Sequence, residues 1–176
     1  MLTVLLGGAR SGKSTAALRL AERSDRPVTF VATSPRIDGD DDLAARIDAH
    51  RAERPATWRT VEAEVDLASA IACAGDDDLV IIDCLTVWLG NLLHHGASDD
   101  DVDAASSLAL EAALARTADT IVITNEVGMG IVPADADTRR YRDLLGRINQ
   151  RWVDRSARAL LIVAGRALPL TDPAAP

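Results

Sequence analysis

A phosphate-binding loop stands near the amino terminus of the chain. Residues 7–14, Gly-Gly-Ala-Arg-Ser-Gly-Lys-Ser, match the pattern G-x-x-x-x-G-K-[ST], and the apolar run Leu2–Leu6 before them is typical of a strand. Glycines let such a loop point its backbone N–H groups at phosphate oxygens, and the helix that follows adds its positive end. We therefore predict a nucleoside triphosphate site formed by Gly7, Gly8, Ala9, Arg10, Ser11, Gly12, Lys13 and Ser14. Within it Lys13 can reach the β- and γ-phosphates, and Ser14 can ligate Mg²⁺.

An acidic residue that could be a second ligand of the metal stands at the end of a predicted buried strand. The run Leu79–Asp83 is apolar up to its last residue, and P-loop enzymes place such a strand-terminal aspartate beside the loop to hold Mg²⁺. The alternative is that Asp83 only caps the helix that begins after it. We favour the metal role, so the sequence predicts a Mg²⁺ site made by Ser14 and Asp83.

His50 stands among arginines in residues 46–55. In a helix, Arg46, His50 and Arg54 would follow one another at intervals of four, although Pro55 biases Arg54 out of the helix. Such cations repel each other, but they suit a bound polyphosphate. They also favour a neutral imidazole, whose ring nitrogen could attack phosphorus. The residues alone leave two interpretations open: a nucleophile, or a histidine at the edge of a packing face.

Strands and helices alternate along the chain and must position these groups. Near-continuous apolar runs predict buried parallel strands at 2–6, 28–32, 79–83, 120–124 and 159–164. Helices are expected at 13–22, 41–53, 65–73, 85–94, 102–116 and 138–158. This order predicts an α/β fold, a P-loop NTPase-like and mainly parallel sheet flanked by helices. We expect one domain over residues 1–169, a loose tail over 170–176, and solvated loops at the Asp-rich stretches, including 96–103.

Composition limits the function classes. The 176 residues are 48% hydrophobic and 26% charged, which argues for a folded core, and their net charge of −8 argues against nucleic-acid binding. No run is long enough to span a membrane, and the first residues do not resemble a signal peptide. With only two cysteines, we expect a cytoplasmic protein with reduced thiols. Lys13 is the one lysine beside 18 arginines.

Two weaker patterns each leave two interpretations. Residues 124–130, Thr-Asn-Glu-Val-Gly-Met-Gly, follow a strand, where open α/β sheets bind ligands, so we favour a ligand site there over the alternative of a tight turn. Along the helix expected at 138–158, four arginines form what we call the arginine stripe: Arg147, Arg151, Arg155 and Arg158. We favour a solvated face with Asp143 and Asp154 as partners, and the minority interpretation is the interface of a homo-oligomer.

Several motifs taken together resemble one enzyme family. They are residues 7–14, Ala-Thr-Ser at 32–34, Ala-Arg-Ile-Asp-Ala-His-Arg-Ala-Glu-Arg-Pro at 45–55, Trp-Arg-Thr-Val-Glu at 58–62, and Asn-Glu-Val-Gly-Met-Gly-Ile-Val-Pro at 125–133. In this order they are similar to the bifunctional adenosylcobinamide kinase/adenosylcobinamide-phosphate guanylyltransferase family of cobalamin biosynthesis. The P-loop alone is generic, but its combination with the histidine and Asn-Glu motifs is specific.

The resemblance implies an activity and a set of contacts. The family phosphorylates adenosylcobinamide with ATP or GTP and then transfers GMP from GTP through a GMP-histidine intermediate, and the histidine of its motif falls on His50. Besides the loop, it implies nucleotide contacts from Ala32, Thr33, Ser34, Arg51, Ala52, Glu53, Arg54, Glu62 and Asp83. Some members carry glutamate at the Asp83 position. Two other functions remain as alternatives: a small-molecule kinase in which His50 only binds phosphate, and a nucleotide switch without transfer chemistry.

Overall fold

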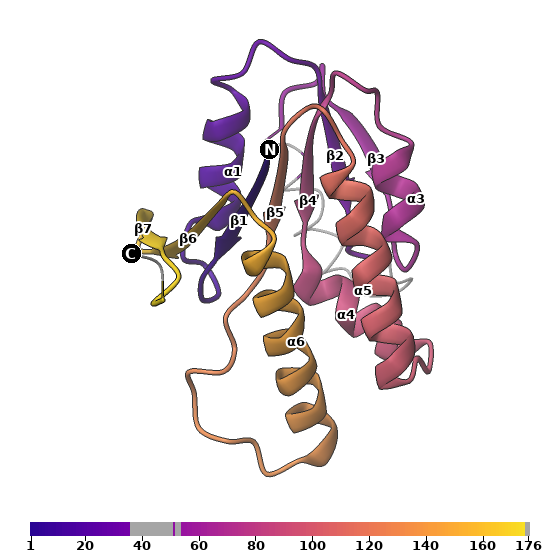
Figure 1. Cartoon of the computed structure of the whole chain (residues 1–176), viewed down its shortest axis with the longest axis vertical. Helices are drawn as coiled ribbons and strands as arrows, with labels where there is room; N and C mark the ends of the chain where they lie inside the picture. The colour runs from indigo at the N-terminus through magenta and orange to yellow at the C-terminus, as the bar shows by residue number, and fades with distance from the viewer. Residues whose placement is uncertain (36–50, 52–53, 175–176) are drawn as a thin grey trace.

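The computed structural model describes residues 1–35, 51 and 54–174 of the chain, and these build one seven-stranded sheet covered by helices (Figure 1). In chain order the described elements are β1 Leu2–Leu6, α1 Lys13–Ala21, β2 Val28–Ala32, β3 Arg59–Glu62, α3 Leu67–Ala72, β4 Leu79–Asp83, α4 Leu85–His94, α5 Asp99–Leu114, β5 Thr120–Ile123, α6 Ala136–Asp154, β6 Arg158–Val163 and β7 Arg166–Leu170. None of the described helices is long and apolar enough to cross a membrane.

The strands lie in the order β3-β2-β4-β5-β1-β6-β7. All neighbouring pairs are parallel except β6 and β7, which form an antiparallel pair. The central strands are buried on both faces, which explains why they are runs of Val, Leu and Ile rather than alternating patterns. The prediction of a mainly parallel α/β sheet flanked by helices is therefore confirmed.

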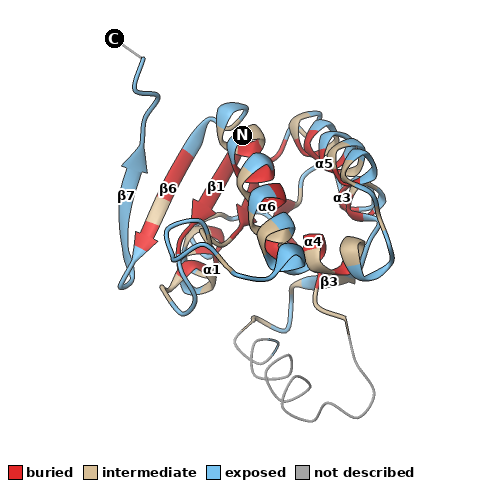
Figure 2. Ribbon diagram, turned by 90° about the horizontal axis from the view of Figure 1, so that it is seen from below, coloured by how far each residue is buried: buried red, intermediate tan, exposed pale blue. Residues whose placement is uncertain are grey.

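Alternate residues of the five inner strands, β1, β2, β4, β5 and β6, enter two separate cores. Leu5, Ile81 and Ile123 face one side of the sheet, where α1 packs with its small residues Ala17 and Ala21. The other face packs against α3, α4, α5 and α6, and the fully buried Trp88 and Trp152 belong to this larger core. In Figure 2 the buried residues follow the strands and the inner faces of the helices, whereas β7 is exposed throughout.

Both edge strands lack the apolar runs that predict buried strands. β3 reads Arg-Thr-Val-Glu and pairs only with β2, so neither of its faces needs to be fully apolar. β7 contains Pro169 and has one strand neighbour, β6. A proline is tolerated at such an edge because one side of the strand donates no ladder hydrogen bonds. Leu170, which we expected to begin the loose tail, is the last residue of β7.

The helix bounds also differ from the sequence-based expectation. The Asp-rich stretch that we interpreted as a loop at 96–103 contains the first turn of α5, which starts at Asp99. A capping box between Ser98 and Asp101 starts the helix there, and aspartates suit the positive end of a helix. α6 ends at Asp154 rather than at Arg158, because residues 155–157 turn the chain into β6, which begins at Arg158.

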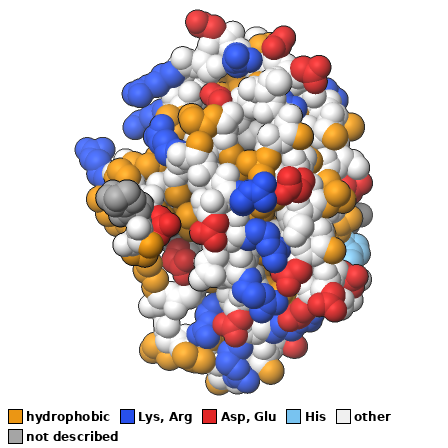
Figure 3. Space-filling model, in the orientation of Figure 1, with side chains coloured by type: hydrophobic (Ala, Val, Ile, Leu, Met, Phe, Trp, Pro, Cys, Tyr) orange, Lys and Arg blue, Asp and Glu red, His pale blue; other side chains and the backbone are white. Residues whose placement is uncertain are grey.

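The arginines of α6 pair with acidic residues of α5 rather than with their own helix alone. Arg147 and Arg151 contact Asp103, at 3.9 and 2.9 Å, and Arg155 contacts Glu111 at 3.0 Å. Figure 3 shows blue and red side chains intermingled over these two helices. These arginines of the stripe therefore connect α6 to α5 by ion pairs on an exposed surface, where each pair contributes little to the free energy of unfolding.

Candidate active site

The carboxyl ends of five parallel strands bring the predicted site residues to one edge of the sheet. β1 leads into residues 7–14, β5 into Asn125, β4 ends at Asp83, β2 leads into Thr33, and β3 ends at Glu62. These strands are neighbours in the sheet, so segments far apart in sequence end side by side. This edge is where open α/β sheets bind ligands.

Two glycines of the phosphate loop, Gly7 and Gly12, stand where a side chain would be crowded. Gly7 has a φ of +153°, and a Cβ there would overlap the carbonyl oxygen of Ile162. Gly12, at the start of α1, has a φ of +98°, and its Cβ would lie 3.1 Å from the Cα of Gly165. The N–H of Gly165 also donates to the Ser11 carbonyl at 2.8 Å, so the β6–β7 turn supports the loop from outside.

Lys13 lies inside the loop and holds its own backbone. Its Nζ donates to the carbonyls of Gly7 at 3.0 Å and Gly8 at 2.7 Å, and only 7% of the residue is exposed. Burial lowers the pKa of Lys13, and the neighbouring Cys84 and Asp83 act in the opposite direction. The ammonium is thus held by weak neutral acceptors, which the oxygens of a polyphosphate would replace favourably.

Ser14 and Asp83 meet across 69 residues of sequence. The Ser14 hydroxyl, in the first turn of α1, donates to Oδ2 of Asp83 at 3.1 Å. Mg²⁺ in phosphate sites is held by one or two protein oxygens, with water and phosphate completing its coordination. A hydroxyl and a carboxylate at this distance fit such an ion. The described residues contain no cluster of three or more His, Cys, Asp or Glu side chains suited to an all-protein metal site.

Thr33 fixes the end of β4. Its Oγ1 donates to the Cys84 carbonyl at 2.9 Å and accepts from the Cys84 N–H at 2.8 Å, and its own N–H donates to the Asp83 carbonyl at 3.1 Å. Asn91 of α4 donates in turn to the Thr33 carbonyl at 2.7 Å. Burial, followed by the Asp83 carboxylate, raises the pKa of Cys84 to about 11, so this thiol stays protonated at neutral pH.

The structure describes some of the remaining predicted site residues and not others. Arg54 stacks its guanidinium 3.5 Å from the ring centre of Phe30 on β2, and Arg51 is exposed. Ala32 pairs in register with both Asp83 and Glu62, which sets Glu62 at the outer strand β3 with β2, β4 and β5 between it and the loop strand. Ser34 is half-buried just after β2. His50, Ala52, Glu53 and Arg46 lie outside the described residues.

Three side chains that sequence reasoning missed support this edge from beneath. Thr86 of α4 accepts the N–H of Asn125 at 2.7 Å, and Asn149 of α6 donates to the Asn125 carbonyl at 3.0 Å. Tyr141 donates to the Thr86 carbonyl at 2.9 Å. Of these three, Asn149 could have been noticed in the sequence, because it is a polar residue beside Ile148 on the apolar face of a strongly amphipathic helix.

The comparisons with known proteins agree with this geometry. The family model for cobinamide kinase / cobinamide phosphate guanyltransferase matches residues 3–170. The chain is 39% identical to the bifunctional adenosylcobalamin biosynthesis protein CobP of Pseudomonas aeruginosa, over 97% of each chain. It is 38% identical to the bifunctional adenosylcobalamin biosynthesis protein CobU of Escherichia coli K12, over 94% of this chain and 97% of that one.

Similar solved structures support the fold alone. The ATPase of a type III secretion system has a TM-score of 0.57 at 12% identity, with 91% of this chain and 50% of that chain covered. The RadB recombinase has a TM-score of 0.51 at 16% identity, with 91% and 73% covered. Because the family model spans nearly the whole chain and the two relatives match it end to end, the chain belongs to the cobinamide kinase / cobinamide phosphate guanyltransferase family.

Proposed function

We propose that this protein phosphorylates adenosylcobinamide with ATP or GTP and then transfers GMP from GTP to adenosylcobinamide phosphate. The family match over residues 3–170 is the observation that carries the proposal. The convergence of Lys13, Ser14 and Asp83 at the phosphate loop supports it, because both reactions need a bound nucleoside triphosphate.

The kinase step is a phosphoryl transfer. The hydroxyl oxygen of adenosylcobinamide forms a bond to the γ-phosphorus, the bond from that phosphorus to the β,γ-bridging oxygen breaks, and the nucleoside diphosphate leaves. The hydroxyl proton passes to solvent. Such transfers depend on positioning and charge more than on a strong base. The loop N–H groups and Lys13 supply both, since they surround the place where negative charge gathers.

The transferase step uses His50 as nucleophile. Its ring nitrogen attacks the α-phosphorus of GTP, the bond to the α,β-bridging oxygen breaks, and pyrophosphate leaves. A phosphate oxygen of adenosylcobinamide phosphate then attacks the same phosphorus and displaces the histidine nitrogen, which gives adenosylcobinamide-GDP. Arg51 and Arg54 are close to His50 in sequence and would balance the charge of the α-phosphate.

The other residues of the edge divide between metal and nucleoside. Ser14 and Asp83 would hold Mg²⁺, which would neutralise phosphate charge when bound. Glu62 stands about 19 Å from the loop strand if each of four strand steps is about 4.8 Å, which suits the ribose or base rather than the phosphates. We assign Ala32, Thr33 and Ser34 to the region between, because β2 adjoins both β4 and β3.

Separate assays of the two steps test this proposal. Transfer of labelled γ-phosphate to adenosylcobinamide reports the kinase, and release of pyrophosphate from GTP in the presence of adenosylcobinamide phosphate reports the transferase. Lys13→Ala should lower both rates by about 100-fold or more, because both use the same phosphate loop. His50→Ala should abolish the transferase and leave most of the kinase rate.

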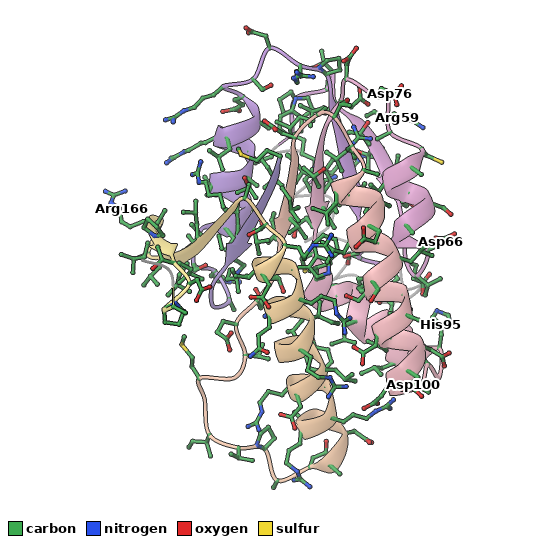
Figure 4. All side chains as sticks on the ribbon, in the orientation of Figure 1. Arg59, Asp66, Asp76, His95, Asp100 and Arg166 are labelled. Carbon is green, nitrogen blue, oxygen red and sulfur yellow. The ribbon has the colours of Figure 1, made fainter. Side chains whose placement is uncertain are left out.

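Two control variants match these changes. Arg166→Ala removes an exposed cation from the outer strand β7, where the side chain points away from the molecule (Figure 4), and should change neither rate. His94→Ala removes an exposed histidine at the end of α4. If the kinase persists in Lys13→Ala, the loop is not the phosphate site. If His50→Ala retains the transferase, guanylyl transfer does not proceed through His50. If the original protein has the kinase but no transferase activity, it is better described as a kinase in which His50 binds phosphate.

The partners and location expected from the sequence remain predictions. We expect adenosylcobinamide, GTP and ATP as the small-molecule substrates, a cytoplasmic location and no nucleic-acid partner. A homo-oligomer also stays a prediction, although the arginine stripe that suggested it is engaged with α5 within one chain.

A further inference from the structure

The peptide that follows β5 is held by side chains from two helices. The N–H of Asn125 donates to Oγ1 of Thr86 at 2.7 Å, and the carbonyl of Asn125 accepts from Nδ2 of Asn149 at 3.0 Å. The next N–H, that of Glu126, donates to the carbonyl of Gly7 at 3.2 Å. A segment outside the sheet ladder is thus fixed at three successive backbone groups.

The two side chains are themselves fixed. Asn149 is 5% exposed, and its Oδ1 accepts from the hydroxyl of Thr124 at 2.7 Å, so its amide cannot turn without losing two bonds. Thr86 lies in the first turn of α4, and Tyr141 of α6 donates to its carbonyl at 2.9 Å. Burying such polar groups is costly unless each is satisfied, so their positions are sharply determined.

We call Thr86 and Asn149, which hold the Asn125 backbone, the clamp. The clamp is connected to the phosphate loop through one planar peptide group. The Asn125 carbonyl and the Glu126 N–H belong to the same planar peptide, so the bond from Asn149 sets the direction of the N–H that holds Gly7. The Gly7 carbonyl also accepts the ammonium of Lys13 at 3.0 Å. A short chain of contacts therefore runs from α6 to the lysine of the loop.

Gly7 is confined from the opposite side as well. A Cβ there would overlap the Ile162 carbonyl of β6, so the backbone of Gly7 packs directly against that strand. With β6 on one side and the Glu126 N–H on the other, the entry of the loop has little freedom while the clamp is intact. Loss of the clamp would release one side only.

We propose that Thr86 and Asn149 are positioning residues for the phosphate loop, acting through the Asn125–Glu126 peptide on Gly7 and Lys13. Their bonds are to the Asn125 backbone, so this role needs no contact with the nucleotide. The proposal rests on the proposed function only in taking residues 7–14 as the phosphate site of both reactions. A displacement of about 1 Å at such a site can cost on the order of 100-fold in rate, which gives the clamp a measurable effect.

Paired substitutions separate positioning from simple stability. Thr86→Val keeps the side-chain shape but removes the acceptor of the Asn125 N–H, and Thr86→Ser restores it. Asn149→Asp removes the donor to the Asn125 carbonyl and keeps an acceptor for Thr124. Thr29→Val is the matched control: Thr29 is also buried, and the variant loses the bond to Asp78, but Thr29 lies at the opposite end of β2 from the site.

Rates and one spectroscopic signal are then measured on the full-length variants. We expect Thr86→Val and Asn149→Asp to lower kcat of both steps by about 10- to 100-fold, with a smaller change in the KM for adenosylcobinamide. Thr86→Ser should stay within about threefold of the original protein. Because Lys13 is the chain's single lysine, ¹³Cε-lysine labelling gives one lysine signal, which should shift in the two clamp variants but not in Thr29→Val.

Three outcomes would overturn the proposal: Thr86→Val with unchanged kcat, Thr86→Ser as impaired as Thr86→Val, or an unchanged Lys13 signal in both clamp variants. Should Thr86→Val fail to fold, Asn149→Asp takes its place. An unchanged kcat or an unchanged Lys13 signal in Asn149→Asp, or a Thr86→Ser variant as impaired as Asn149→Asp, would then overturn the proposal. If the original protein itself shows neither activity, the proposed function fails, while the Lys13 signal still tests the clamp.

Discussion

The ammonium of Lys13 illustrates how strongly a single position can determine the chemistry of this site. The chain uses arginine almost everywhere else, yet the phosphate loop retains lysine. A compact ammonium donates to both the Gly7 and the Gly8 carbonyls, whereas the planar guanidinium of arginine presents its donors in a fixed fork. The buried ammonium also lacks the full hydration that it would have in water, which is why its pKa is lowered.

We predict that the titration midpoint of Lys13 lies below its ordinary value of 10.5 in the nucleotide-free protein. The same ¹³Cε-lysine label measures it. Addition of GTP should move the midpoint upward, because phosphate oxygens favour the charged form. A midpoint at or above 10.5 in the free protein, or none of this upward movement with GTP, would contradict the geometry described for the loop.

The sign of the stability effect follows from the same shift. The folded protein binds the Lys13 proton less tightly than the unfolded chain does. Between the folded pKa and 10.5 the unfolded state therefore binds more protons, and this group makes the free energy of unfolding increase as pH rises through that window. Below this window, the buried ammonium of Lys13 therefore lowers the free energy of unfolding, so folding stability alone would not favour a lysine at this position.

At the scale of elements, sequence predicts what is apolar or periodic and misses what depends on neighbours. The central strands can be predicted from their apolar runs, because both of their faces are buried. β3 and β7 do not, since each has only one neighbour and polar or proline residues are tolerated there. The clamp of Thr86 and Asn149 is also invisible in sequence, because its bonds span 39 and 24 residues and exist only once β5 lies between β4 and β1.

The start of α5 gives an element-scale prediction. Ser98 and Asp101 hydrogen-bond reciprocally, with Ser98 Oγ accepting from the Asp101 N–H at 3.2 Å and the Ser98 N–H donating to Oδ2 of Asp101 at 3.0 Å. Ser98→Ala should lower the free energy of unfolding by about 1 kcal/mol, measured by urea denaturation. It should also raise the pKa of Asp101, because the Ser98 bonds hold that pKa low.

The control for this prediction lies in the same helix. Ser107 is exposed and donates only to the Asp103 carbonyl one turn earlier, so Ser107→Ala should change stability little or increase it slightly. Both variants should keep their full catalytic rates. Equal losses of stability in the two variants would show that the serine at the helix start has no special role.

At the scale of the whole molecule, the proposed function assigns two reactions to one sheet edge. Five strands end there in spatial order, so the loop, Asp83, Thr33 and Glu62 follow one another across the sheet. The net charge of −8 conceals this arrangement, because the cations of the site are local while the acidic residues are spread along helices such as α5. A single triphosphate held along this edge can present its γ-phosphorus to one acceptor and its α-phosphorus to another.

The GMP-histidine intermediate is the part of the account that separates this protein from an ordinary P-loop kinase, and it can be trapped directly. The protein is incubated with α-³²P-GTP and Mg²⁺, denatured, and tested for label on the polypeptide. We predict label that is stable to alkali and lost in acid, as expected for a phosphorus–nitrogen bond, that is present in His94→Ala and His95→Ala and absent in His50→Ala. Catalytically active protein without such label, or label that survives in His50→Ala, would contradict guanylyl transfer through His50.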